Sequence, residues 1–113
     1  PAWSFEANLS NARAGSALLG VGDLDGDGRG EIAVGMPGVT NGQSSEGRVA
    51  VFSGTTTGAS TTPTWTVEPN VASVGLGAAL AVADLDVDGK RDLIVGAARR
   101  PTDGSSLGAL LVY

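Results

Sequence analysis

Short apolar runs alternate with stretches of Gly, Ser, Thr, Asn and Asp along the whole chain of 113 residues. The runs in the first half cover 16–23, 31–36, 48–53 and 64–68, and those in the second half cover 77–84, 92–97 and 109–113. Small and β-branched apolar residues between turn-forming residues are typical of β-strands, and no stretch has helical spacing. The pattern therefore predicts an all-β chain of short strands.

The strand pattern occurs twice, with a repeat of 61 residues. Residues 23–52 align with 84–113 without a gap, and eleven of the thirty aligned positions are identical. A unit of four antiparallel strands that repeats at this length is typical of a β-propeller blade. We therefore expect β-propeller blades, one at 14–70 and a second at 71–113.

The N-terminal stretch PAWSFE matches PTWTVE at 63–68, the expected fourth strand of the first blade. The second blade has three predicted strands, the third of which reaches Tyr113. We expect residues 1–13 to hold a fourth strand and a linker, with the strand from Trp3 to Glu6 completing the second blade of another copy. Head-to-tail strand exchange would then close a homo-oligomeric ring, a trimer or a tetramer. The alternative is an excised or engineered two-blade fragment of a longer propeller.

Two acidic stretches, DLDGDGRGE at 23–31 and DLDVDGKRD at 84–92, hold eight of the twelve acidic residues. Acids stand at positions 1, 3, 5 and 9 of each stretch, and a glycine at position 6 permits a sharp turn. The expected side-chain ligands of a cation are Asp23, Asp25, Asp27 and Glu31 in the first stretch, and Asp84, Asp86, Asp88 and Asp92 in the second. The backbone carbonyls of Arg29 and Lys90, at position 7, would add one oxygen each. Ligands that are all hard oxygens favour Ca²⁺, with Mg²⁺ second, and predict about two Ca²⁺ ions per chain.

Two other readings of the acidic stretches are weaker. An EF-hand loop closes with a Glu at position 12 and is flanked by helices, whereas position 12 is Val34 or Val95 here and the flanks are predicted strands. A solvated acidic turn is the simpler alternative, because Asp and Gly are ordinary turn residues. The same four-acid pattern at the same place in both repeats favours a metal site.

Composition excludes several classes of function. The net charge of −5 argues against a nucleic-acid partner, and two bound Ca²⁺ ions would bring it to −1. The chain has neither Cys nor His, and so it lacks thiolate metal sites and the commonest general base. No apolar run is long enough to insert into a membrane. We therefore expect a protein that is not an enzyme.

The repeats resemble FG-GAP repeats, the blades of the integrin α-subunit propeller and of many bacterial surface proteins. The first unit carries DLDGDGRGE, VGMP and GRVAVF, and the second carries DLDVDGKRD, VGAA and GALLVY. The resemblance implies calcium in both loops, an extracellular or cell-surface location and a role in adhesion. The chain departs from the family pattern at Ala14 and Leu76, where the family has Phe, at Ala98 in place of Pro, at Glu31 in place of Asp, and at Val87 in place of a small or polar residue.

We therefore expect a calcium-binding β-propeller module in which the metal is structural and the propeller is a scaffold for assembly or adhesion. The alternative is a carbohydrate-binding lectin in which Trp3 or Trp65 stacks on a sugar, although packing between blades is the more ordinary role for these side chains. Arg99 and Arg100 are expected to be a solvated pair rather than an anion site. Met36 and Phe52 are expected in the core.

Overall fold

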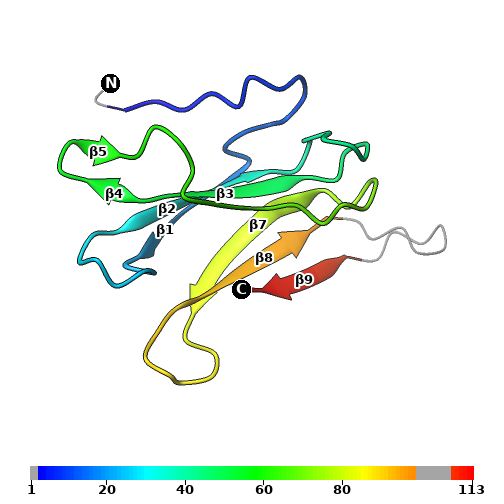
Figure 1. Cartoon of the computed structure of the whole chain (residues 1–113). Helices are drawn as coiled ribbons and strands as arrows, with labels where there is room; N and C mark the ends of the chain where they lie inside the picture. Colours follow the sequence, from blue (N-terminus) through cyan, green and yellow to red (C-terminus); the bar gives the residue numbers. More distant parts are fainter. Residues whose placement is uncertain (1–2, 99–107) are drawn as a thin grey trace.

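Two antiparallel sheets make up most of the structure, a computed structural model that describes residues 3–98 and 108–113 (Figure 1). The first sheet has the strand order β1 (Ala17–Gly22), β2 (Glu31–Met36), β3 (Arg48–Phe52) and β6 (Trp65–Val67). The second has the order β7 (Leu76–Ala83), β8 (Asp92–Ala97) and β9 (Ala109–Val112). The prediction of an all-β chain of antiparallel sheets is confirmed. No helix in the described residues is long and apolar enough to cross a membrane.

One pair of strands was not predicted. The Thr- and Gly-rich segment after β3 forms a small hairpin of β4 (Gly54–Thr55) and β5 (Gly58–Ala59). Its strands are two residues long, and a strand of that length leaves no alternation of apolar and polar residues to detect. The stretch at residues 3–6, which was expected to be a strand, has no strand partner in the described part of the chain.

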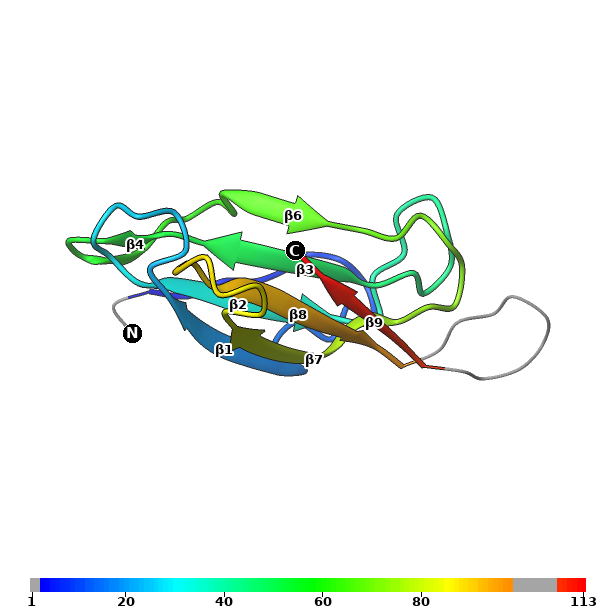
Figure 2. The ribbon, with the colours of Figure 1, turned by 90° about the horizontal axis from the view of Figure 1, so that it is seen from below.

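The second sheet packs face to face on the first (Figure 2), and β7 lies against β1, β2 and β3. Alternation along the strands directs Val49 and Val51 of β3 toward the second sheet, and directs Leu93 and Val95 of β8 toward the first. All four side chains are buried, and burying each contributes about 1.5–3 kcal/mol. This shared core holds the two blades together.

Small residues stand where the two sheets touch most closely. A Cβ atom on Gly35 would lie 2.1 Å from the carbonyl oxygen of Gly77, and that spacing is too short for any side chain. Gly77 itself has a φ of 88°, which favours glycine. The glycines of β2 and β7 therefore set the distance between the blades.

The connection from β6 to β7 is hydrogen-bonded to the first blade along its last residues. The N–H groups of Ser73, Gly75 and Leu76 donate to the carbonyls of residues 44, 45 and 46 at 2.7, 3.0 and 3.0 Å. A parallel bridge between Gly47 and Leu76 continues this contact into β7. The link between the blades is thus part of the packed structure.

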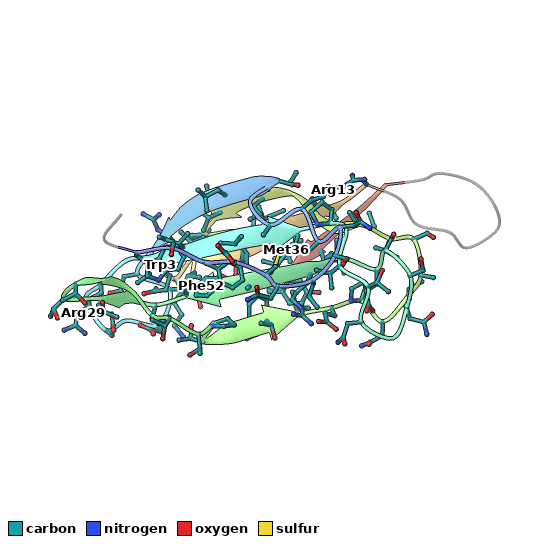
Figure 3. The ribbon with its side chains drawn as sticks, turned by 90° about the horizontal axis from the view of Figure 1, so that it is seen from above. Trp3, Arg13, Arg29, Met36 and Phe52 are labelled. Atoms are coloured by element: carbon teal, nitrogen blue, oxygen red, sulfur yellow. The ribbon has the colours of Figure 1, made fainter. Side chains whose placement is uncertain are left out.

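The N-terminal segment lies across the face of the first sheet opposite to the second sheet (Figure 3). Trp3 and Phe5 pack on Phe52, with ring centroids 5.5 and 4.7 Å apart, and Trp3 Nε1 donates to the carbonyl of Ser60 at 3.0 Å. Met36 and Phe52 are buried beneath this segment, which confirms their expected place in the core.

The same aromatic contact occurs a second time between the blades. Trp65 of β6 meets Tyr113 edge to face, with centroids 5.3 Å apart and an interplanar angle of 65°. The Trp3–Phe52 pair has 5.5 Å and 71°. Because Phe52 and Tyr113 are repeat equivalents, the N-terminal segment sits on the first blade as β6 sits on the second. Trp65 therefore has the packing role between blades that was preferred for it, whereas Trp3 packs on the first sheet.

Candidate metal centres

Two acidic loops occupy the same end of the two sheets (Figures 1 and 2). The first, residues 23–30, joins β1 to β2, and the second, residues 84–91, joins β7 to β8. Each loop follows the end of the first strand of its blade, and so the repeat places both acidic clusters in equivalent positions. Each acidic stretch combines a loop with the first residue of the following strand, Glu31 or Asp92.

The first loop folds around its own carboxylates. Asp23 accepts hydrogen bonds from the N–H groups of Gly26 and Gly28 at 2.7 and 2.8 Å. Both glycines have positive φ, 81° and 85°, which lets the chain turn tightly about the Asp23 side chain. Asp25 and Asp27 accept from backbone N–H groups two residues further on, at 3.1 and 2.7 Å. These contacts draw the loop into a ring with the carboxylates on its inside.

Glu31, the first residue of β2, closes this ring on the side of the strand. Its Oε2 accepts a hydrogen bond from the N–H of Leu24 at 2.6 Å. The residue is only 3% exposed, and its Oε1 is buried without a hydrogen-bond partner among the described residues. Burying a charged oxygen without a partner is costly, since it loses its hydration and gains nothing in return. A cation bound among the four carboxylates would supply the missing partner.

Carboxylate oxygens of Asp23, Asp25, Asp27 and Glu31 lie within 4.8 Å of one another. Two like charges at about 4 Å repel by about 1 kcal/mol even in bulk water, and by more near a protein surface. One nearby cation, Arg29, reaches Asp27 at 3.8 Å, but this pair is largely exposed and contributes little. A set of oxygen ligands alone suits a hard divalent cation, and the residues present therefore fit Ca²⁺.

The second loop repeats most of the hydrogen bonds of the first, but Asp84 accepts from Asp88 and not from Val87, the equivalent of Gly26. Asp84 accepts from the N–H groups of Asp88 and Gly89 at 3.1 and 2.9 Å, and Asp86 accepts from Asp88 at 3.2 Å. Asp92 accepts from the N–H of Leu85 at 2.7 Å, as Glu31 does from Leu24. The two loops therefore share most of their hydrogen bonds, although the two acidic stretches differ in sequence at positions 4, 7, 8 and 9.

The second cluster is smaller than the sequence predicted. Oxygens of Asp84, Asp86 and Asp88 lie within 4.8 Å of one another, and Asp92 is not part of that group. Asp92 is one methylene shorter than Glu31 and stands at the equivalent place. The first loop thus brings all four predicted carboxylates together, and the second brings together three.

Arg29 and Lys90 hold the predicted carbonyl positions. Their N–H groups donate to Asp27 and Asp88 at 2.7 and 2.8 Å, so each backbone lies beside its carboxylate ring. Val87 occupies the position of Gly26 and has a φ of 61°, a left-handed conformation that is unusual for a β-branched residue. The second turn is therefore strained where the first is not.

Two features near the loops were not predicted. Arg91 reaches from the second loop to the first blade, where its Nη1 lies 3.4 Å from the carbonyl oxygen of Val21. Arg91 also lines a cleft of about 390 Å³ between the blades, together with Asp25, Trp65 and Tyr113. Long-range contacts of this kind depend on how the blades pack, and the repeat gives no signal for them because Gly30 stands at the equivalent of Arg91.

A comparison with known families gives one assignment that fits this geometry. The model described as FG-GAP-like repeat matches residues 23–95, which include both acidic loops and most of the strands that flank them. The chain belongs to the FG-GAP-like repeat family. The resemblance drawn from the sequence motifs is thereby confirmed.

Several curated proteins carry sequence similar to this FG-GAP chain. Phosphatidylinositol-glycan-specific phospholipase D of Rattus norvegicus is 36% identical over 111 residues, 96% of the chain and 13% of that protein. Integrin alpha-IIb of Mus musculus is 41% identical over 87 residues, 75% of the chain and 8% of that protein. Integrin alpha-V of Gallus gallus is 38% identical over 92 residues, 76% of the chain and 9% of that protein. The chain therefore spans a small part of the length of each of these relatives.

One predicted pair cannot be placed, and one buried acid was not predicted. Arg99 and Arg100 lie outside the described residues. Glu46, at the opposite end of the first sheet, is a second buried carboxylate: its Oε1 accepts from the N–H of Asn41 at 2.9 Å, and its Oε2 has no partner in the described part of the chain. No other acid gathers around Glu46 among those residues, so it is not part of a candidate metal cluster.

Proposed function

We propose that this chain is a calcium-binding pair of propeller blades in which the metal is structural. One observation carries the proposal: a ring of four carboxylates that is closed by Glu31, whose buried Oε1 has no hydrogen-bond partner in residues 3–98 and 108–113. The second loop supports it, since Gly89 donates to Asp84 there as Gly28 donates to Asp23 in the first loop. Arg29, Lys90 and Asp92 complete the ligand sets in this proposal.

In this proposal Ca²⁺ joins the two strands that each loop connects. The unbound loop holds mutually repelling carboxylates, and in the bound loop the cation between β1 and β2 or between β7 and β8 balances two of their negative charges. A site that forms only in the folded chain adds its binding free energy to the stability of the fold. The chain's own residues supply the ligands, the turn and the buried floor of the site.

The biological role proposed for this module is an assembly or adhesion scaffold outside the cell or at its surface. Its support is the similarity to integrin alpha chains. The similarity to a phospholipase covers a small part of that enzyme, and the chain offers no His or Cys for catalysis. We therefore propose a binding function without enzymatic activity.

Thermal unfolding with and without calcium tests the structural role. We expect excess chelator to lower the melting temperature, and we expect Asp84→Ala to lower it in calcium by more than Thr56→Ala, a change on an exposed turn outside both loops. Titration calorimetry should give about two Ca²⁺ ions per chain for the native protein and about one for Asp84→Ala. A melting temperature that chelator leaves unchanged would contradict the proposal.

Carbohydrate binding is a second candidate, favoured by the cleft between the blades. Trp65 and Tyr113 are both exposed in part and line this cleft, with Asp25 and Arg91 as polar groups beside them. Aromatic faces next to polar side chains suit a sugar ring. A glycan array should then show binding that is lost in Arg91→Ala, and an array without any bound glycan would remove this candidate.

A further inference from the structure

The outer face of the second sheet is apolar and uncovered in the described structure. This outer face consists of Ala81, Ile94, Leu110 and Val112, which the strand registers place on the side away from the first sheet. Leu110 is 71% exposed and Val112 is 50% exposed, whereas their repeat equivalents Val49 and Val51 are 0% and 5% exposed under the second sheet. The same positions are thus a packed interface in one blade and a free face in the next.

No described residue pairs with the outer edge of β9. Tyr113 and Leu93 exchange N–H···O bonds with each other at 2.8 and 3.0 Å. Because bonding alternates along an antiparallel pair, Leu111 faces β8 and the N–H and C=O groups of Leu110 and Val112 point outward from the sheet. In the first sheet the equivalent residues of β3 pair with β6, at Val49↔Val67 and Val51↔Trp65.

The chain also carries the surface that would fit this face and edge. Residues 3–6 repeat the sequence of β6 and lie on the first blade as β6 lies on the second. Beside them is an apolar hollow of about 150 Å³ lined by Trp3, Phe5, Ala14, Gly15, Leu18 and Val34. Val95, the repeat equivalent of Val34, belongs to the core into which Val49 and Val51 pack.

We propose that the outer face of the second sheet binds the first blade of a second copy of this chain. Residues 3–6 of the second copy add to the free edge of β9, while Leu110 and Val112 pack into the hollow beside them. The internal contact between the two blades supplies the register: Val112 pairs with Trp3 of the second copy, and Leu110 pairs with its Phe5. For copies of the 113-residue chain alone, repetition head to tail closes a ring, and propellers of about four to eight blades make a trimer or a tetramer the expected size.

Native mass spectrometry of the 113-residue chain in calcium-containing buffer tests this assembly. We expect a single species of three or four chain masses, and a monomer would overturn the inference. The calcium count in the same spectrum separates this result from the proposed function: a monomer with two Ca²⁺ ions would leave the metal sites intact and remove only the assembly.

Two substitutions at one position test the edge itself. Leu110→Pro removes the outward N–H and should convert the ring to monomer, because the bond to a second copy is lost while the bonds to β8 stay. Leu110→Thr removes the same leucine but keeps the N–H, and it should still form the ring. Assembly of both variants alike would overturn the proposed strand pairing.

An engineered disulfide between two copies tests the register of residues 3–6 against β9, independently of the proline variant. Leu111 and Ser4 of the second copy would be a pair that is not hydrogen-bonded, and such pairs bring Cα atoms to about 4.5 Å, within disulfide range. The chain has no cysteine, so Ser4→Cys with Leu111→Cys should give covalent oligomers on oxidation. Ser4→Cys with Leu110→Cys, which points to the other face, should not. Equal cross-linking in both pairs would overturn the register.

Discussion

Replacing Glu31 by Gln should change stability in opposite directions with and without calcium. The amide can still accept the hydrogen bond from the Leu24 N–H through its carbonyl oxygen, and its NH₂ group can donate to the neighbouring carboxylates. The substitution therefore keeps the shape of the site and removes one negative charge. We expect Glu31→Gln to be more stable than the native chain in chelator and less stable in calcium.

The size of each effect follows from the cluster. Glu31 has three carboxylates within 4.8 Å, so removing its charge relieves three repulsions of about 1 kcal/mol each in water, or about 3 kcal/mol at low salt. Salt reduces this gain, since the three aspartates of the cluster are exposed at the loop surface. In calcium, the loss of one charged ligand should weaken the site by about tenfold, which corresponds to about 1.4 kcal/mol.

Calorimetric melting of the native chain and of Glu31→Gln, each in calcium and in chelator, measures these opposite changes in stability directly. Glu46→Gln is the matched control, because Glu46 is also buried with one bonded and one unpartnered oxygen but lies outside the acidic loops. Its effect should be the same in calcium and in chelator. If Glu31→Gln likewise shifts the melting temperature by equal amounts in both buffers, Glu31 is not a metal ligand.

Two further changes test the packing and the strained turn. Gly35→Ala should destabilise the chain by about 1–3 kcal/mol, because its Cβ would meet the Gly77 carbonyl, whereas Gly20→Ala, with open space around its Cβ, should be neutral or slightly stabilising in the same urea titration. Val87→Gly should raise stability by about 0.5–1 kcal/mol, since relief of the left-handed valine exceeds the added entropy of the unfolded chain. A fall in melting temperature for Val87→Gly would refute the strain at this turn.

The repeat made much of this fold predictable. Apolar runs between turn residues gave each main strand to within two residues, and the acids at alternating positions identified Asp23, Asp25 and Asp27 as one cluster. The reach of Arg91 to Val21 was beyond prediction, because it depends on the angle between blades and has no equivalent in the other repeat. The hairpin β4–β5 was missed because its strands are too short to carry a pattern.

The sequence also did not predict that the Asp92 carboxylate lies outside the group formed by the other three acids of its loop. Asp92 and Glu31 hold the same place in the repeat and make the same hydrogen bond, and they differ by one methylene group. A spacing rule treats them alike, whereas the approach of a carboxylate to its neighbours depends on side-chain length. Predictions from spacing are therefore better at naming a ligand position than at deciding whether its side chain reaches.

The hydrogen bonds between residues 44–46 and 73–76 have a mechanical consequence. A linker between two domains usually acts as a hinge, but here the last residues of the connection are bonded to the loop between β2 and β3. Tension applied along the chain must break these hydrogen bonds at the same time before one blade can separate from the other. It must also pull apart the closely packed backbones of Gly35 and Gly77. The pair of blades should therefore transmit force as one stiff unit.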